Sequence, residues 1–275
     1  MANFDAFRFN GKRVLVVGGA TGMGAAAAEL ALDAGADVVV MDYAEVTPSG
    51  ATAIHVNLAE RESIDAAIEE CGGPVHAIMA CAGVADGTPN IERINFVGHR
   101  HLIERMIELG HLGAGGSVAF ISSAAGLGWE ANMEVIKGAL ETTDYDSGVA
   151  WFQENGKADY YHSKQVVCAY VASQAFPMLQ KGIRINAVCP GPTETPLALA
   201  NEDTWLAFGA DYREALGIKA STPQEQAGPL LFLCSDAAVA VNGITMITDA
   251  GYMMSGITES FPDATFLAKL LMGRS

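Results

Sequence analysis

The chain has 275 residues, 50% of them hydrophobic, and a formal net charge of −16 at pH 7. This length and hydrophobic content can bury a sizeable core, either as one large α/β domain or as two small ones. The negative charge would be repelled by a nucleic-acid backbone and by an anionic membrane surface, so neither is an expected partner.

The cysteines and the N-terminal sequence both bear on cellular location. The five cysteines form no Cys-x-x-Cys pair and are scattered through apolar runs, which favours reduced, buried thiols and no zinc site. The sequence MANFDAFRFNGKR has polar and charged residues where a signal peptide needs an apolar run, and no stretch reaches the ~18 apolar residues of a membrane span. We therefore expect a cytoplasmic protein.

Short runs rich in β-branched residues alternate with longer helical patterns along the chain. Such continuous apolar runs are typical of a parallel sheet buried on both faces, and the segments between them are long enough for right-handed helical crossovers. No repeat or linker divides the chain, so the sequence predicts a single domain over 1–275 with a doubly wound, Rossmann-type α/β fold. The seven expected strands are residues 13–18, 37–42, 53–56, 75–83, 117–123, 183–191 and 243–248.

Three segments decorate the expected sheet: an insertion at 128–156, a substrate loop at 192–217 and a C-terminal tail at 252–275. The insertion has an apolar stripe at i, i+4, i+7 and i+11, which predicts an amphipathic helix. The stripe consists of Trp129, Met133, Ile136 and Leu140. Because the insertion joins two predicted site residues, we expect its helices to border the substrate entrance and to contact a neighbouring subunit. The apolar loop and the tail are each a candidate lid or interface.

The motif GGATGMG directly follows the first expected strand and opens an alanine-rich helix. Its glycines Gly18, Gly22 and Gly24 let the backbone turn sharply and approach a pyrophosphate, which the helix N-terminus attracts. The spacing is Gly-x-x-x-Gly-x-Gly rather than the standard GxGxxG. The motif therefore indicates a phosphate site only because a strand precedes it and a helix follows it. In that context it predicts a dinucleotide site.

The second expected strand ends at Asp42, about 20 residues after the glycine motif, where this fold places the acid that binds the adenosine ribose. An aspartate there favours NAD, because its carboxylate would repel the 2′-phosphate of NADP. Neither GGATGMG nor DYAEVT contains an arginine or lysine that could receive that phosphate. The alternative is an exposed aspartate at a strand end.

Ligands of such sheets bind beyond the carboxyl ends of the strands, which puts Ser122 and Ser123 in the same crevice as the cofactor. Further along the chain, the sequence ADYYHSKQ contains two adjacent tyrosines and a lysine. On a helix Tyr160 and Lys164 share one face, whereas Tyr161 is turned away by roughly 100°. The alternative is two core or interface tyrosines beside a surface lysine.

Taken together, these motifs resemble the short-chain dehydrogenase/reductase family across nearly the whole chain. The resemblance is carried by the glycine motif, ACAG, INFVG, ISS, Tyr-x-x-x-Lys, NAVCPGPTETPL and TDAG. The long separation between Ser123 and Tyr160, together with the turn PGPTETPL, further resembles the bacterial 3α-hydroxysteroid dehydrogenase/carbonyl reductase branch, which carries a helical insertion at this place.

The resemblance implies catalytic roles for four residues. A tyrosine with an unperturbed pKa near 10 is a poor base at neutral pH unless a nearby cation favours its phenolate. Tyr160 is the implied general acid/base, and Lys164 is the cation, which also binds the nicotinamide ribose. Ser123 orients the substrate oxygen, with Ser122 structural, and Asn95 helps to hold a water for proton relay.

The resemblance also implies a larger set of cofactor-binding residues, in which Thr193 contacts the nicotinamide carboxamide. Beyond the three glycines, Asp42, Tyr160 and Lys164, the set comprises Thr21, Met23, Asn57, Leu58, Cys81, Ala82, Gly83, Pro190, Gly191 and Thr193. The chain departs from the family pattern where Gly18 replaces a threonine and ACAG replaces NNAG. Both departures remove polar side chains that fix the loops near the cofactor.

The implied function is an NAD-dependent oxidoreductase that interconverts an apolar secondary alcohol (hydroxysteroid-like, aryl or terpene) and its ketone. A non-catalytic NAD-binding or sensing protein of the same fold is the alternative, and an enoyl reductase would need a wider tyrosine-to-lysine spacing. No metal site is expected from His99, His101 and His111, because i, i+2 positions on a helix do not face each other. We expect them at the surface or a subunit interface. Their helix and that of Tyr160 are the usual subunit contacts of the family, which implies a homo-oligomer, a dimer or a tetramer.

Overall fold

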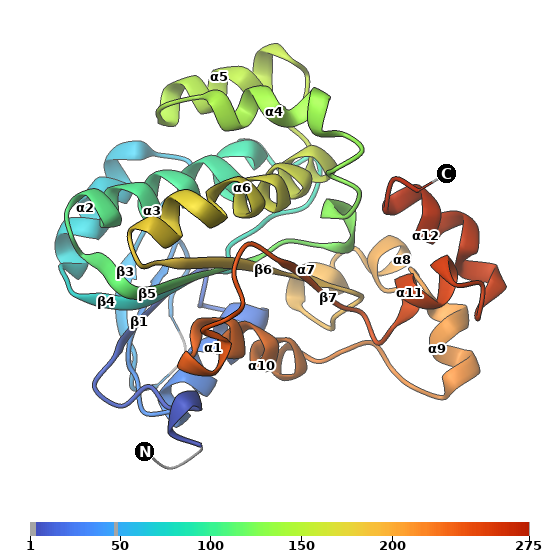
Figure 1. Cartoon of the computed structure of the whole chain (residues 1–275), viewed down its shortest axis with the longest axis horizontal. Coiled ribbons are helices and arrows are strands. Elements are labelled where there is room, and N and C mark those ends of the chain that lie inside the picture. The colour runs from blue at the N-terminus through green and yellow to red at the C-terminus, as the bar shows by residue number, and fades with distance from the viewer. Residues whose placement is uncertain (1–3, 47–48, 275) are drawn as a thin grey trace.

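The computed structural model describes residues 4–46 and 49–274, and it confirms the predicted α/β fold with a seven-stranded parallel sheet. The spatial order is β3-β2-β1-β4-β5-β6-β7, so the chain begins inside the sheet and winds outward in both directions (Figure 1). The strands are β1 (Arg13–Val17), β2 (Asp37–Asp42), β3 (Thr52–His55), β4 (Val75–Ala80), β5 (Leu112–Ile121), β6 (Arg184–Pro190) and β7 (Thr245–Thr248).

Helices cover both faces of the sheet, two on one face and three on the other (Figure 1). The pair is α1 (Gly22–Asp33) and α10 (Pro223–Cys234); the three are α2 (Arg61–Cys71), α3 (Gly98–Glu108) and α6 (Tyr160–Gln180). The residues of β1 and β4 are almost all buried, as expected of strands covered on both sides. The strand order reverses between β1 and β4, which makes the carboxyl ends of these strands the place where a ligand crevice forms.

Strand β5 starts five residues earlier than the sequence predicts, at Leu112 instead of 117. Its first residue pairs with Val75, and after an irregularity in the register Ser117 pairs with Ala77. The segment between them, 113–116, reads Gly-Ala-Gly-Gly. Residues with small or no side chains give no apolar alternation, so this part of the strand carries no recognisable pattern.

The insertion forms two helices, α4 (Met133–Glu141) and α5 (Tyr145–Glu154). A capping box starts α5: the Ser147 N–H donates to the Asp144 carboxylate at 2.8 Å, and the Asp144 N–H donates to the Ser147 hydroxyl at 3.2 Å. Trp129, predicted as the first residue of the apolar stripe, lies before α4 and packs half-buried against the core. The observed helix α4 is therefore about one turn shorter than the apolar stripe that predicted it.

Helix α4 packs on the outer side of α6, and α5 packs beside α4 on the π-helical turn Arg93–Val97 (Figure 1). Ile136 of α4 and Phe152 of α5 are fully buried in the same core cluster as Val167 and Tyr170 of α6. Apolar stripes of this size are seldom left exposed, and here the chain buries them against itself. Much of the α6 face that the resemblance implied as a subunit contact is therefore covered by the chain's own insertion.

The remaining helical segments gather mainly beside β6 and β7, at the right of Figure 1. Short turns aside, they are α7 (Pro196–Leu199), α8 (Glu202–Trp205), α9 (Ala210–Leu216), α11 (Tyr252–Ile257) and α12 (Thr265–Leu271). The short turns are the 3-10 segments Asp5–Phe7, Ala124–Gly126, Asp236–Ala238 and Pro262–Ala264, and the π-helical turn Arg93–Val97 that leads into α3.

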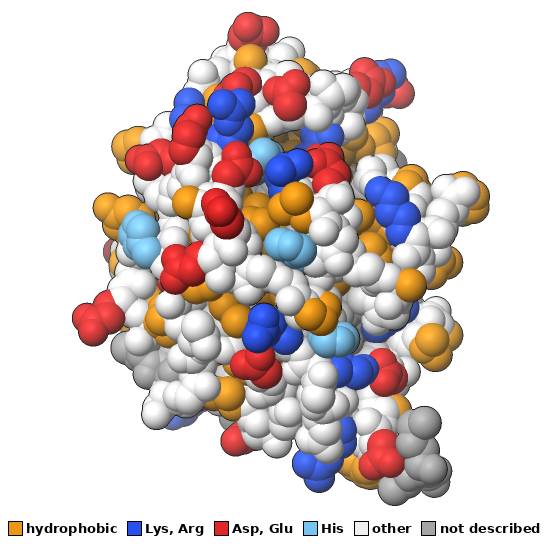
Figure 2. Space-filling model, turned by 90° about the vertical axis from the view of Figure 1, so that its left-hand side faces the viewer, with side chains coloured by type: hydrophobic (Ala, Val, Ile, Leu, Met, Phe, Trp, Pro, Cys, Tyr) orange, Lys and Arg blue, Asp and Glu red, His pale blue; other side chains and the backbone are white. Residues whose placement is uncertain are grey.

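Acidic and basic side chains are interspersed on the face shown in Figure 2. Exposed ion pairs include Arg105–Glu108 at 2.6 Å and Arg61–Asp146 at 3.0 Å, and such pairs contribute little stability individually. All five cysteines are free thiols. Within the described ranges, no helix is both long and apolar enough to cross a bilayer, and no three His, Cys, Asp or Glu side chains come together as metal ligands.

Candidate active site

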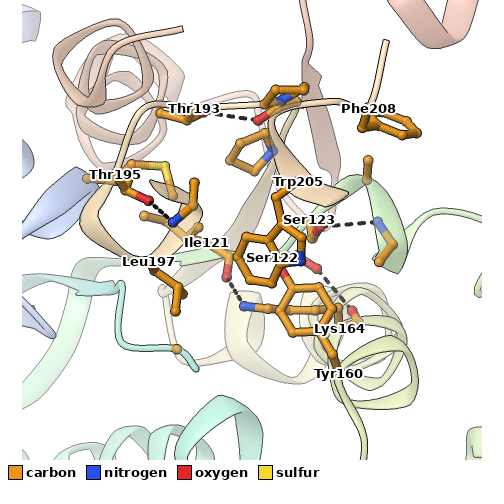
Figure 3. Close-up of a pocket in the computed structure, with 18 of the residues that line it drawn as sticks. Ile121, Ser122, Ser123, Tyr160, Lys164, Thr193, Thr195, Leu197, Trp205 and Phe208 are labelled. Atoms are coloured by element: carbon orange, nitrogen blue, oxygen red, sulfur yellow. Dashed lines mark hydrogen bonds between the residues drawn. The ribbon is translucent and has the colours of Figure 1, made fainter. Parts of the chain in front are cut away.

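Two connected cavities lie at the carboxyl ends of the strands. One, of about 520 Å³, runs along the glycine motif and the end of β2; we call it the groove. The other, of about 320 Å³, lies between the end of β5, the start of α6 and the 192–217 loop; we call it the apolar cavity (Figure 3). Both are lined by Met23, Cys81, Gly83, Thr195 and Leu197, so a ligand bound in the groove can reach into the apolar cavity.

The glycine motif forms a wall of the groove that leaves no room for side chains. Gly18 has a φ of +86°, and a Cβ there would lie 2.3 Å from the backbone nitrogen of Ala82. A Cβ on Gly24 would lie 2.0 Å from the carbonyl oxygen of Gly18. Thr21, Gly22 and the following residues therefore bring the first turn of α1 to the groove, where its free N–H groups suit a phosphate.

Asp42 lies at the end of β2 and lines the groove, as predicted. Its Oδ2 accepts the N–H of Ala20 at 2.8 Å and its Oδ1 accepts that of Ala44 at 2.9 Å. A carboxylate offers about four lone-pair sites, so capacity remains for ribose hydroxyls. No arginine or lysine is among the described residues that line the groove.

The predicted residues Asn57, Leu58, Cys81, Ala82 and Gly83 all line the groove. They come from the loop after β3 and the loop after β4, which lie on either side of the ribose-binding position expected for Asp42. The structure thus brings together residues that are far apart in the sequence, as the resemblance implied. Their individual contacts with a cofactor remain predictions.

His99 departs from the surface or subunit-interface role predicted for it. It is 1% exposed, and its Nε2 lies 3.0 Å from the carbonyl oxygen of Ala82. Burial lowers the pKa of His99 to about 4, so the ring is neutral at pH 7 and its Nε2–H is the donor. A donor that comes from α3 therefore holds the loop after β4 at Ala82.

The two serines after β5 have different surroundings. The Ser122 hydroxyl donates to the carbonyl oxygen of Lys164 at 3.0 Å, accepts the Cys168 thiol at 3.2 Å, and is buried. Ser123 accepts the N–H of Ala125 at 3.2 Å and lies half-buried in the wall of the apolar cavity (Figure 3). Ser123 is thus the serine available to a ligand, and Ser122 holds β5 to α6.

Tyr160 and Lys164 stand one turn apart at the start of α6 and both line the apolar cavity (Figure 3). The Asp159 side chain caps this helix by accepting the N–H of His162 at 2.8 Å. Lys164 Nζ lies 5.6 Å from the centre of the Tyr160 ring and donates to the carbonyl oxygen of Ile121 at 3.1 Å. Tyr161, the neighbouring tyrosine, is 40% exposed and is absent from the described lining of both cavities.

The expected lowering of the tyrosine pKa by Lys164 is not found. Burial raises the pKa of Tyr160 to about 12, opposed by a hydrogen bond with Ser123. Burial also lowers the pKa of Lys164 to about 8. The ammonium is directed at the Ile121 carbonyl rather than at the phenol oxygen, so desolvation dominates at Tyr160. In this geometry Tyr160 is a protonated donor at neutral pH.

Asn95 is buried in the π-helical turn before α3 and braces the loop after β4. Its Oδ1 accepts the N–H of Val84 at 2.8 Å, and its Nδ2 donates to the carbonyl of Val84 at 3.1 Å and to the Ser163 hydroxyl at 3.1 Å. The side chain therefore joins the groove loop to the helix of Tyr160. Its water-relay role stays a prediction.

Pro190, Gly191 and Thr193 line the apolar cavity at the end of β6. The Thr193 hydroxyl donates to the carbonyl oxygen of Gly191 at 3.0 Å, and the residue is buried. Thr195, which the sequence reading missed, lines both cavities and caps α7 by accepting the N–H of Ala198 at 3.1 Å. The repeated Thr-x-Thr of PGPTETPL is the signal that could have included it.

The far walls of the apolar cavity come from the substrate loop and the C-terminal tail. Leu197, Trp205 and Phe208 belong to the loop, and Leu271 ends α12 of the tail. In Figure 3 the Trp205 ring lies over Tyr160; the ring centroids are 5.0 Å apart. The loop and the tail, each expected to be a lid or an interface, thus both contribute walls to this cavity.

The insertion forms the helices predicted for it, but they do not form a wall of the apolar cavity. The described residues that line the apolar cavity include none from 128–156. The insertion does start and end at the site, as its connection to Ser123 and Tyr160 requires. Its apolar residues, however, pack on α6 and the π-helical turn, where a larger apolar surface is available to cover them.

Comparisons with known proteins agree with this geometry. A family model described as "Enoyl-(Acyl carrier protein) reductase" matches residues 18–253. The chain is 31% identical to cis-4-hydroxycyclohexanecarboxylate dehydrogenase of Sinomonas cyclohexanicum, covering 88% of this chain and 96% of that one. It is 27% identical to 3-alpha-hydroxysteroid dehydrogenase/carbonyl reductase of Comamonas testosteroni, covering 86% and 95%.

A solved structure shows the same fold. The 3-alpha-hydroxysteroid dehydrogenase of Pseudomonas sp. B-0831, solved in complex with NADH, superposes with a TM-score of 0.72 at 24% identity and covers 91% of this chain and 99% of that one. The family match extends from the glycine motif past β7 and so includes Ser123, Tyr160 and Lys164. The chain belongs to the short-chain dehydrogenase/reductase family.

Proposed function

We propose that this chain is an NAD-dependent oxidoreductase that interconverts an apolar secondary alcohol and its ketone. The observation that carries the proposal is the arrangement at the junction of the two cavities. Ser123, Tyr160 and Lys164 line the apolar cavity, and Gly83, beside Lys164, belongs to both cavities. A nicotinamide that enters from the groove would therefore meet a substrate held by two hydroxyl groups.

The groove fits NAD on several counts. The glycine motif leaves only backbone where a pyrophosphate would lie, and the N-terminus of α1 favours its charge. The Asp42 carboxylate at the far end suits ribose hydroxyls and disfavours a 2′-phosphate. The related structure from Pseudomonas sp. B-0831 contains NADH. When bound, the nicotinamide supplies or accepts the hydride.

The chain's own residues move the proton. In ketone reduction the Tyr160 hydroxyl, whose pKa of about 12 keeps it protonated, donates to the substrate oxygen while the Ser123 hydroxyl holds that oxygen in place. In alcohol oxidation the phenolate accepts the proton, and the buried ammonium of Lys164 is the nearby charge that stabilises it. Asn95 keeps the loop after β4 against this helix through Val84 and Ser163.

The substrate we propose is neutral and carries a ring. The cavity walls are mostly apolar, and Lys164 is the single charged side chain among the described residues that line the cavity. An isolated carboxylate would be costly to bury there without a second cation. Both relatives are named for ring alcohols, a hydroxycyclohexanecarboxylate and a hydroxysteroid, so their names support the ring but not the absence of charge. Hydroxysteroid-like, aryl and terpene alcohols all satisfy these limits.

The test is a panel of secondary alcohols with the purified protein and NAD⁺, followed by the absorbance of NADH. We expect turnover with neutral ring alcohols such as androsterone, 1-phenylethanol or menthol, and much less with cis-4-hydroxycyclohexanecarboxylate. Reduction of the matching ketones with NADH should follow the same ranking. If NADH binds but no alcohol or ketone turns over, the non-catalytic NAD-binding alternative takes the place of this proposal.

Two further expectations belong to the same proposal. A homo-oligomer, dimer or tetramer, should be seen by light scattering, although the insertion already covers much of the outer face of α6. A cytoplasmic location should be seen by cell fractionation. Neither affects the chemistry assigned to the site.

A further inference from the structure

Helix α5 of the insertion contacts the backbone of a residue that lines the groove. The Tyr145 hydroxyl at its N-terminus donates to the carbonyl oxygen of Leu58 at 3.0 Å, and Tyr145 is 4% exposed. Leu58 follows β3 and lines the groove together with Asn57. Burial raises the pKa of Tyr145 to about 12, so its hydroxyl remains a donor at neutral pH. The insertion thus makes a buried polar contact with a groove-lining residue.

This contact is transmitted to a side chain that faces the groove. A peptide group is planar, so fixing the Leu58 carbonyl also fixes the N–H of Ala59 in the same plane. That N–H donates to Oδ1 of Asn57 at 3.1 Å. Arg93 donates to the next carbonyl, that of Ala59, at 3.1 Å. Tyr145 therefore helps to set the orientation of the Asn57 side chain through one rigid peptide group.

The rest of α5 is attached to the wall that carries Asn95. The Phe152 and Phe96 rings lie 6.1 Å apart, and the Gln153 side chain donates to Glu92, which is 2% exposed, at 2.9 Å. At Gly148 a Cβ would come within 3.3 Å of Val97. The close fit along the π-helical turn means that α5 cannot shift without moving this wall.

We propose that the 128–156 insertion supports the adenosine end of the groove, with Tyr145 as a positioning residue that holds the loop of Asn57 and Leu58. The proposal depends on the assignment of the groove to NAD but not on the identity of the alcohol. It gives the insertion a role in cofactor affinity, separate from the substrate cavity, which it does not line.

The variant Tyr145→Phe removes only the hydroxyl that holds Leu58. Calorimetric titration with ADP-ribose, which contains the adenosine end without nicotinamide, should show a Kd about fivefold higher than for the unmutated protein, the effect of losing one net hydrogen bond. The kcat with saturating NAD⁺ should change little. The matched control is Tyr170→Phe, because Tyr170 is also buried and its hydroxyl lies 3.3 Å from Glu104, a residue that lines neither cavity in the described structure. Its Kd should equal that of the unmutated protein.

A measurement on the unmutated protein covers the case in which Tyr145→Phe does not fold. Coupling between two sites is reciprocal, so bound ADP-ribose must stabilise α5 if α5 stabilises the groove. Hydrogen exchange of the α5 amides should slow on adding ADP-ribose, while that of α9, on the opposite side of the apolar cavity, should not. Three results would overturn this proposal and leave the groove assignment intact. They are unchanged hydrogen exchange in α5, an unchanged Kd for Tyr145→Phe, and a rise in Kd for Tyr170→Phe equal to that for Tyr145→Phe. Failure of the unmutated protein to bind ADP-ribose would overturn the groove assignment and the proposal together.

Discussion

The ring of Trp205 lies 5.0 Å from that of Tyr160, centroid to centroid, at an interplanar angle of 44°. Trp205 ends the short helix α8 of the substrate loop, whereas Tyr160 starts α6 on the other side of the apolar cavity. The contact therefore joins the lid-like loop directly to the proposed acid/base. It also contributes to the burial that raises the pKa of Tyr160 to about 12.

Replacing Trp205 should shift the pH dependence of the reaction. In Trp205→Ala water reaches the phenol, and the pKa of Tyr160 should fall from about 12 toward 10. Alcohol oxidation needs the deprotonated tyrosine, so the rise of kcat/KM with pH should move to lower pH. The control is Phe208→Ala, which also enlarges the cavity but removes a ring that packs on Tyr252. A shift of equal size in both variants would contradict this account.

The two adjacent tyrosines should respond differently to the same substitution. Tyr160→Phe removes the proposed proton donor and should lower kcat by about 10²-fold to 10⁴-fold, the usual contribution of a positioned acid/base, with NADH binding retained. Tyr161→Phe changes a side chain that is 40% exposed and should keep most of the activity. Steady-state rates and NADH fluorescence titrations of the two variants decide the matter. Similar losses in both would show that the proton donor was assigned to the wrong residue.

The fold could be predicted because the core strands carry long apolar runs. Val14, Leu15, Val16 and Val17 of β1 are all 0% exposed, and this continuous burial is what the sequence pattern records. The start of β5 could not be predicted, because the glycine-rich segment 113–116 has no apolar alternation. An apolar pattern depends on side chains, whereas this segment is part of the sheet through its backbone, and backbone pairing leaves no such pattern in the sequence.

The site could be predicted only where a motif fixes backbone and chemistry together. Gly18 and Gly24 are such positions, since their close contacts allow no side chain. For the insertion, apolar periodicity showed that a face must be buried but not against which partner, and Phe152 packs beside Phe96 rather than at the substrate. Leu271 belongs to the tail that the sequence offered as a lid or an interface, but which of the tail's apolar residues reaches the cavity is decided by tertiary packing.

Cofactor preference should depend on the charge of Asp42. The unmutated enzyme should prefer NAD(H) over NADP(H) by at least about tenfold in kcat/KM, or ~1.4 kcal/mol. Asp42→Asn removes the charge but keeps an oxygen that can accept one of the N–H groups of Ala20 and Ala44. It should therefore reduce the preference for NAD(H), mainly by raising kcat/KM with NADP(H). Asp42→Ala should also reduce this preference, but with a larger loss of activity with NAD(H). Comparable rates of the unmutated enzyme with both cofactors would remove the role given to this carboxylate.

Lys164 should lower the stability of the protein at neutral pH, because its position in the site buries its ammonium. The residue is 4% exposed, and burial lowers its pKa from 10.5 to about 8. Between these values the unfolded chain binds more protons than the folded one, so the contribution of Lys164 to the free energy of unfolding becomes more favourable as pH rises from about 8 to 10.5. Below pH 8 the folded state carries the full cost of a buried ammonium, about 3 kcal/mol.

Lys164→Met should therefore raise the melting temperature at pH 7 and abolish turnover. The gain is reduced by about 1 kcal/mol through loss of the hydrogen bond to the Ile121 carbonyl. It should shrink further by pH 10, where the unmutated lysine is already neutral in the folded state. The control is Lys181→Met, which changes an exposed lysine just after the same helix and should give a small difference that does not vary with pH. Calorimetric scans of the three proteins at pH 7 and pH 10 make the comparison. A difference between Lys164→Met and the unmutated protein that is the same at both pH values would mean that Lys164 has the same pKa in the folded and unfolded chains, so that burial imposes no cost on its ammonium.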